Sequence, residues 1–148
     1  MSLKTPPSIC AEHEELHAEL AKAIKAGSDT GKAARGVDCV LHPHFLKEEE
    51  YALPPLGLLP ALASGTALPD AAAAMGMAGR LRADLGQMLQ EHKEIALALN
   101  ALTEAAKKEN KEEFVRFAEK LALHARMEEE VLYPASILIG EYLKLKKG

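Results

Sequence analysis

The chain has 148 residues, of which 48% are hydrophobic and 27% charged, and its formal net charge is -4. This size suits one domain, residues 1–148, with a core that needs no disulfides, and the lack of strong basic charge argues against nucleic-acid binding. No apolar run is long enough to cross a membrane and no leader-like segment starts the chain, so we expect a cytoplasmic protein with no membrane contact.

The composition favours helices. Only 4% of the residues are aromatic and tryptophan is absent, while alanine, leucine, glutamate and lysine are frequent. Apolar residues recur with the period of an α-helix in four long segments, at about residues 6–26, 29–52, 80–108 and 110–133. Short loops join the first pair and the last pair, so each pair should be antiparallel. The sequence therefore predicts an all-α, up-down four-helix bundle.

The remaining segments should add short helices to this bundle. Residues 53–79 are rich in proline and glycine and predict a long crossover with one short helix near residues 70–75. We expect Asn110, with Glu113 as cap partner, to open the fourth long helix, and Pro134 to end it. The amphipathic tail, residues 135–146, predicts a short helix packed on a core bundle of about residues 6–134.

Two patterns of metal-binding residue types each occur twice, in the same order in both halves of the chain. A Glu-His pair stands at residues 12–13 and again at 91–92, and His-x-x-x-Glu stands at 44–48 and again at 124–128. Residues four apart share one helix face, so each His-x-x-x-Glu can present both side chains to one site. The repetition predicts an internal twofold repeat with one symmetric site for two metal ions.

These polar residues occupy positions of the apolar helix stripes. His92, for example, lies between Met88 and Ile95 in steps of three and four residues. Each of the four stripes carries a histidine, and two also carry a glutamate. A buried, unpaired carboxylate costs several kcal/mol, and no lysine or arginine lies on the stripes. Two divalent ions would balance this core, and the candidate ligands are His13, His44, Glu48, His92, His124 and Glu128.

Several other histidine, glutamate and cysteine residues could also take part in a metal site, and some of them leave alternatives open. His17 lies one turn from His13 and is either a fifth histidine ligand or part of the site's lining. His42 lies on the opposite face of its helix from His44, so we expect it at the surface. Glu49 and Glu129 lie off the stripes and are either solvated or support the ligands. Cys10 and Cys39 form no C-x-x-C pair, and we expect them to be reduced and buried.

With this set of residues the chain resembles the hemerythrin-like, or HHE cation-binding, family over about residues 8–135. The resemblance implies a four-helix bundle that holds a non-haem di-iron centre, with the six candidate residues as ligands and both glutamates bridging the irons. Manganese and zinc are the alternative metals. The oxygen carriers of the family have one more histidine where this chain has Ala96, and their helix-four carboxylate corresponds to Glu129; the core stripe favours Glu128.

The resemblance also implies a function. We expect a protein that binds or senses O₂, NO or iron, in a stress response or in iron–sulfur cluster repair, as a homodimer or with another protein partner. One alternative is a di-iron oxidase or peroxidase, in which Tyr51, one turn beyond Glu48, takes part in redox chemistry. The other is a bundle with a purely structural metal. The sequence leaves open whether the protein is an enzyme, although it favours binding.

Overall fold

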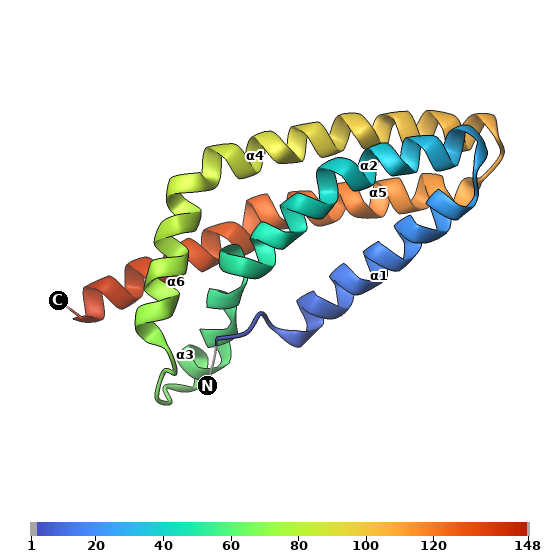
Figure 1. Ribbon diagram of the computed structural model, residues 1–148. Coiled ribbons are helices and arrows are strands. Elements are labelled where there is room, and N and C mark those ends of the chain that lie inside the picture. Colours follow the sequence, from blue (N-terminus) through green and yellow to red (C-terminus); the bar gives the residue numbers. More distant parts are fainter. Residues whose placement is uncertain (1–2, 148) are drawn as a thin grey trace.

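The computed structural model describes residues 3–147, and within this range all regular secondary structure is helical (Figure 1). Four long helices form the bundle, namely α1 (Pro7–Lys25), α2 (Ser28–Lys47), α4 (Ala71–Lys108) and α5 (Glu112–Met127). Helix α1 packs against α2 and α5, and α4 packs against the same two helices. Neighbouring helices run in opposite directions (Figure 1), so the predicted all-α, up-down four-helix bundle is confirmed.

Two π-helical turns interrupt the bundle helices at corresponding places. The turn η1 (Glu48–Ala52) continues α2, and η3 (Glu128–Leu132) joins α5 to α6 (Tyr133–Lys147). In each turn a backbone N–H bonds to the carbonyl five residues earlier, from Leu53 to Glu48 and from Tyr133 to Glu128. Such turns often occur at functional sites, and both of these begin at a predicted ligand glutamate.

The crossover contains short helices, as predicted, but at other positions. They are a 3₁₀ turn, η2 (Pro54–Leu58), and the helix α3 (Leu59–Ser64). The helix expected at residues 70–75 is instead the beginning of α4, which starts at Ala71 rather than at Arg80. Helix α6 packs against this part of α4, where Ala74 and Ala78 are buried. This packing outweighs the low helix propensity of the glycines that had suggested a break.

Two predicted boundaries of the fourth helix are wrong. Pro134 does not end it, because α5, η3 and α6 follow one another without a gap. A π turn interrupts the regular pattern of backbone hydrogen bonds. A proline that directly follows the turn therefore removes no hydrogen bond of a regular α-helix, although it has no backbone N–H. Asn110 adopts a positive φ of 57° at the end of α4, and α5 starts at Glu112 without a side-chain cap. Glu113 therefore does not act as a cap partner.

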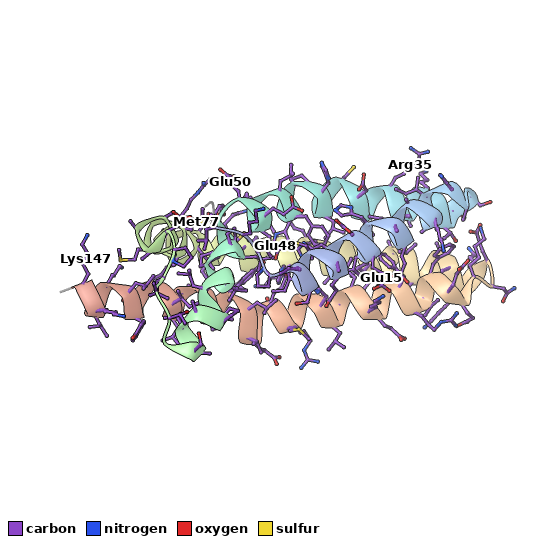
Figure 2. The ribbon with its side chains drawn as sticks, turned by 90° about the horizontal axis from the view of Figure 1, so that it is seen from below. Glu15, Arg35, Glu48, Glu50, Met77 and Lys147 are labelled. Carbon is purple, nitrogen blue, oxygen red and sulfur yellow. The ribbon has the colours of Figure 1, made fainter. Side chains whose placement is uncertain are left out.

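The buried apolar residues form two clusters on either side of a polar layer. One cluster, which includes Leu16, Val37, Leu99 and Phe117, lies towards the loops that join α1 to α2 and α4 to α5. The other packs the crossover and α6 against α4. Glu48 lies inside the bundle between them, whereas Glu50 points away (Figure 2). No helix in the described part of the chain is long and apolar enough to cross a membrane.

The beginning of α2 is capped by Glu109, a residue from the second half of the sequence. The Glu109 carboxylate, just after α4, accepts hydrogen bonds from the backbone N–H groups of Thr30 at 3.0 Å and Asp29 at 3.3 Å. The Thr30 hydroxyl also donates to it. These hydrogen bonds, that of the Thr30 side chain above all, lower the pKa of Glu109 to about 2. An anion at a helix N-terminus stabilises the helix.

We expect Glu109→Gln to lower the urea midpoint of unfolding at neutral pH. Because the pKa of Glu109 is depressed in the folded state, its contribution is complete above about pH 4.5 and is lost as the pH falls towards 2. The difference in midpoint between the two proteins should therefore shrink in acid. Glu119→Gln, at an exposed position inside α5, is the matched control and should unfold like the unmodified protein. A difference for Glu109→Gln that does not change with pH would contradict this role.

Candidate metal centre

The four bundle helices bring all six predicted ligand residues into one layer of the core. Each of them is at most 6% exposed. Their side chains form two groups in which the nitrogen and oxygen atoms lie close enough to hold an ion. One group contains His44, Glu48, His92 and Glu128, and the other contains His13, His124 and Glu128. The sequence thus predicted which side chains converge, and the two groups share a glutamate.

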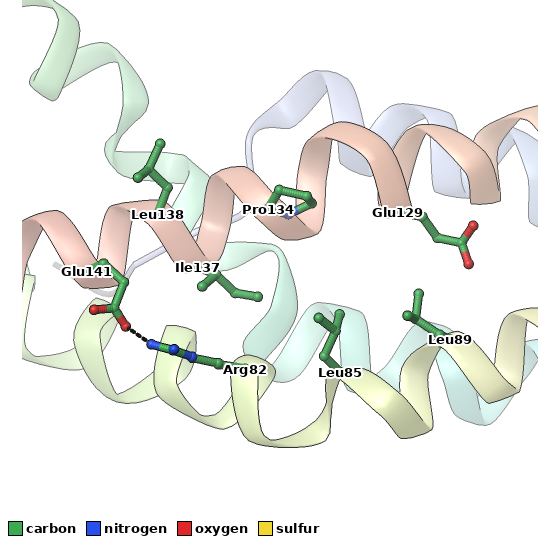
Figure 3. A pocket seen from close by; sticks show the side chains of 8 residues that line it. All are labelled: Arg82, Leu85, Leu89, Glu129, Pro134, Ile137, Leu138 and Glu141. Atoms are coloured by element: carbon green, nitrogen blue, oxygen red, sulfur yellow. Dashed lines mark hydrogen bonds and ion pairs between the residues drawn. The ribbon is translucent and has the colours of Figure 1, made fainter.

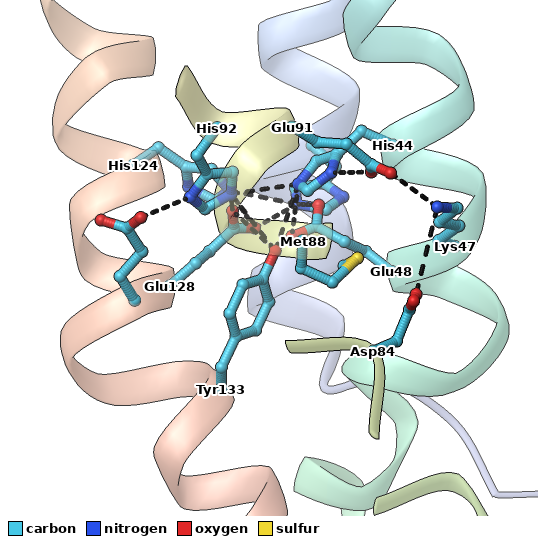
Figure 4. A network of polar contacts seen from close by, with 12 residues as sticks. His44, Lys47, Glu48, Asp84, Met88, Glu91, His92, His124, Glu128 and Tyr133 are labelled. Atoms are coloured by element: carbon cyan, nitrogen blue, oxygen red, sulfur yellow. Dashed lines mark hydrogen bonds and ion pairs between the residues drawn. The ribbon is translucent and has the colours of Figure 1, made fainter. Parts of the chain in front are cut away.

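The histidines pair across the bundle. The Nε2 atoms of His44 and His92 lie 3.0 Å apart (Figure 4), and those of His13 and His124 lie 3.1 Å apart. Two ligands at right angles on one ion, with bonds of about 2.1 Å, lie about 3 Å apart. The spacing of each pair therefore matches two ligands of a single metal ion.

The two buried glutamates lie between the histidine pairs. The Oε1 of Glu48 is 3.6 Å from His13 Nε2, while its Oε2 is 3.5 Å from His44 Nε2. The Oε1 of Glu128 is 3.1 Å from His92 Nε2, while its Oε2 is 3.1 Å from His124 Nε2. Each carboxylate thus turns one oxygen towards each pair, although only Glu128 belongs to both ligand groups.

Two further glutamates orient the histidines from outside. The Nδ1–H of His44 donates to Glu91 Oε1 at 2.8 Å, and that of His124 donates to Glu12. Both glutamates directly precede a ligand histidine in the sequence, but the pairing is with the histidine of a neighbouring helix. Because Nδ1 carries the proton, the Nε2 lone pair points into the site. Sequence reasoning noted the repeated Glu-His pairs but did not assign this role to the glutamates.

The electrostatics of Glu91 fit this role. Burial alone would raise its pKa, but hydrogen bonds from Lys47, His44 and Gln87 outweigh burial and lower the pKa to about 2. The Lys47 ammonium lies 2.6 Å from Glu91 Oε2. Glu91 is therefore ionised at neutral pH and is a strong acceptor for the imidazole N–H.

The charge balance of the site also fits bound cations. Glu48 Oε1 and Glu128 Oε2 are buried without a hydrogen-bond partner, and within residues 3–147 neither carboxylate forms an ion pair with lysine or arginine. Burial, and then the charge of Glu128, raises the pKa of Glu48 well above its usual value. Cations would balance the charge of the two buried carboxylates, and this donor set suits iron, manganese or zinc.

The residues that the sequence left open take distinct places. Glu129 lies outside both groups, and its Oε1 is 3.3 Å from His92 Nδ1. His42 is exposed, as predicted. His17 also lies outside both groups. The Phe45 ring stacks on His13 at 4.1 Å and meets the His17 ring edge-on at 5.0 Å. Of the two histidines at the start of the chain, only His13 thus faces the other candidate ligands.

A tyrosine lies in the site, but it is not the one that the sequence singled out. The Tyr51 hydroxyl donates to Asp84 and approaches the Met88 sulfur at 3.7 Å, so it faces away from Glu48. Tyr133 instead donates to Glu48 Oε2 at 2.6 Å. The sequence feature that could have identified Tyr133 is its position five residues after Glu128. A π turn brings residues at this spacing towards the same side of the helix.

A cavity of about 410 Å³ borders the candidate ligand His92, and a second cavity reaches the candidate ligand His13 from the surface. The second cavity has a volume of about 600 Å³ and is lined by the N-terminal segment, α1 and residues 49, 53 and 54. Exposed Cys10 and Glu14 stand in its wall beside buried His13, so it connects solvent with that imidazole.

Cys10 and Cys39 are both free, but they are exposed rather than buried as expected.

A larger groove lies between α4 and α6 (Figure 3). Its lining is mostly apolar, with Leu85, Leu89 and Ile137 among its residues, and an ion pair between Arg82 and Glu141 crosses one end at 2.5 Å. Among the residues that line this groove, Glu129 approaches the candidate ligand His92. The groove itself contains none of the six candidate ligands, so the chemistry belongs to the bundle core.

We expect Glu91→Gln to weaken metal binding by roughly 10- to 100-fold, the usual cost of losing a group that orients a histidine ligand. Glutamine cannot offer the charged acceptor that holds His44 Nδ1–H. Competition with a chelator of known affinity measures the change. Glu94→Gln, on the exposed side of the same helix, should bind metal as the unmodified chain does. Equal affinities for all three proteins would show that Glu91 does not support the site.

Comparison with known proteins agrees with this geometry. A family model described as the hemerythrin HHE cation-binding domain matches residues 8–136, which include all six candidate ligands and both outer glutamates. No curated protein and no solved structure gave a significant match. The match to the family model covers most of the chain and identifies a domain that binds cations.

Proposed function

Because the chain belongs to the hemerythrin HHE cation-binding family, we propose that it holds two iron ions in the bundle core and binds a diatomic molecule, O₂ or NO, at them. The two ions would be held by His13, His44, Glu48, His92, His124 and Glu128. When bound, ferrous iron supplies the electrons that make reversible binding of such a molecule favourable. The protein would then act as a binder or sensor.

The observation that carries this proposal is the position of the two buried carboxylates. Glu48 and Glu128 each place one oxygen near one histidine pair and the other oxygen near the second pair. A carboxylate that served a single ion would not need both oxygens at separate histidines. Two bridged ions also explain why two acidic side chains tolerate burial so close together.

Iron is our choice among the metals that this donor set accepts. Mixed imidazole and carboxylate ligands suit iron and manganese, whereas structural zinc sites usually include cysteine. The free cysteines, Cys10 and Cys39, are both exposed and outside the two ligand groups. A purely structural zinc site is therefore the weaker interpretation.

The surrounding residues support binding of a small molecule. Apolar clusters lie on both sides of the polar layer, and they limit the access of water from the two ends of the bundle. The cavity that ends at His13 has room for a diatomic molecule. Glu12 and Glu91 hold two of the imidazoles in fixed orientations, so the ligand set is organised before the metal enters.

One observation favours an enzymatic alternative. The phenol of Tyr133 donates a hydrogen bond within the centre, and a buried phenol can take part in one-electron chemistry. An oxidase or peroxidase that uses iron would therefore be the second candidate function. Turnover of peroxide or of ferrous iron in solution would distinguish it from reversible binding.

The test begins with anaerobic loading of ferrous iron, followed by exposure to O₂ or NO and then by degassing. We expect about two irons per chain and a visible absorption change that degassing reverses. His44→Ala and His124→Ala should lose both, whereas His42→Ala, an exposed histidine on the same helix as His44, should keep both. Failure to bind iron would refute the iron centre, and an irreversible change with turnover would favour the enzyme.

A further inference from the structure

The hydroxyl of Tyr133 lies among the ligand atoms of one of the two groups. It is 2.6 Å from Glu48 Oε2, 3.1 Å from His44 Nε2, 3.2 Å from His92 Nε2 and 3.5 Å from Glu128 Oε1 (Figure 4). These are the four residues of the first group. Tyr133 is 0% exposed, and every partner that its hydroxyl has in the described chain belongs to this group.

These distances are those expected between ligands of a common ion. Ligands at right angles with bonds of about 2.1 Å are about 3 Å apart, and tetrahedral ligands are slightly further apart. Three of the four distances from the Tyr133 oxygen, 3.1, 3.2 and 3.5 Å, agree with these values, and the hydrogen bond to Glu48 Oε2 is shorter, at 2.6 Å. An ion between His44 and His92 would therefore have the phenol oxygen within reach without movement of the helix.

Within residues 3–147, the second group has no corresponding phenol oxygen. Beside His13 stands the ring of Phe45, stacked at 4.1 Å with an interplanar angle of 6°. Phe45 has no atom that can bind a metal. The residue that corresponds to Tyr133 after the other π turn is Leu53, which is buried and apolar. The two halves of the site are thus chemically different although their histidines and glutamates correspond.

We propose that Tyr133 coordinates the ion held by His44 and His92 through its phenolate oxygen, so that the two ions have different ligand sets. The inference rests on the proposed iron centre. As the ion binds, the O–H bond of the phenol breaks, a bond between metal and oxygen forms, and the proton is released to solvent. No oxidant or reductant is needed for this step.

The π turn explains how a residue in this position reaches the site. In a regular α-helix, residues five apart point in directions about 140° apart. The turn η3 inserts one extra residue between Glu128 and Tyr133, which brings their side chains towards the same face. Glu128 and Tyr133 can then contact the same ion from one helix.

The test uses the full chain loaded with iron and oxidised to the ferric state. Tyrosinate bound to ferric iron gives a charge-transfer band in the visible range and tyrosine ring vibrations in the resonance Raman spectrum. We expect both signals in the unmodified protein, and complete loss of both in Tyr133→Phe with about two irons still bound per chain. Tyr51→Phe is the matched control and should keep both signals, because its hydroxyl faces Asp84.

A measurement on the unmodified protein does not depend on any variant. Incorporation of ring-deuterated tyrosine should shift the same Raman bands. Two irons per chain without tyrosinate signals, or signals that persist in Tyr133→Phe, would overturn the phenolate ligand and leave the proposed iron centre intact. Absence of bound iron would overturn the centre itself, and the phenolate ligand with it.

Discussion

Glu128→Gln should reduce metal binding from about two ions per chain to at most one weakly bound ion. Glu128 belongs to both ligand groups, with Oε1 3.1 Å from His92 Nε2 and Oε2 3.1 Å from His124 Nε2. Glutamine has similar size, but it is neutral and replaces one of the two oxygens with a donor group that repels a cation. We expect a loss of affinity of at least about 100-fold for the second ion.

Measurement of metal content after dialysis tests this result, with Glu129→Gln as the control. Glu129 is the neighbour of Glu128, its side chain is 37% exposed, and it approaches only the outer nitrogen of His92. It should keep two ions. A Glu128→Gln protein that retains two tightly bound ions would show that Glu128 is no bridge.

The sequence could identify the six convergent residues because burial follows a simple period. Side chains in steps of three and four residues share one helix face, and polar residues that interrupt such a stripe must lie in the core. His92, between Met88 and Ile95, is a clear case, and it is 6% exposed. The same rule separated Glu128 from Glu129, which differ by one position and therefore by about 100° around the helix.

The same rule failed wherever the helix departs from the regular period. Tyr133 was not assigned to the site, because the extra residue of η3 changes which positions share a face. Pro134 was interpreted as a helix end for the same reason. Tyr51 was expected near the metals from its spacing to Glu48, but η1 starts at that glutamate and its hydroxyl bonds to Asp84 instead. Single-sequence patterns give no direct sign of a π turn.

Contacts between helices were the second limit. The pairing of Glu91 with His44, and of Glu12 with His124, depends on which helices are neighbours and on their relative height. Likewise, Phe45 of α2 contacts both His13 and His17, and His17 lines the cavity at His13 without joining a ligand group, which no pattern within α1 could reveal. Periodicity determines which face a side chain occupies, but not which residue of another helix stands opposite.

Removal of the metal ions should lower the melting temperature by roughly 20 to 30 °C. An ion present at about 1,000 times its dissociation constant adds about 4 kcal/mol to the free energy of unfolding, and two ions add about twice that. In a chain of this size each kcal/mol corresponds to roughly 3 °C. The ions stabilise only the folded chain, because only there do the side chains of the two ligand groups converge.

Melting followed by circular dichroism, with excess metal and then with a chelator, measures this difference. In the double variant His44→Ala/His124→Ala the difference should nearly vanish, because each histidine pair loses one member. The double variant His17→Ala/His42→Ala removes the same residue type from outside both ligand groups and should keep the full difference. If metal stabilised both double variants equally, the stabilising ions would lie elsewhere on the protein. Because each buried carboxylate contacts both histidine pairs, we also expect the single variants His44→Ala and His124→Ala to lose more than half of the difference.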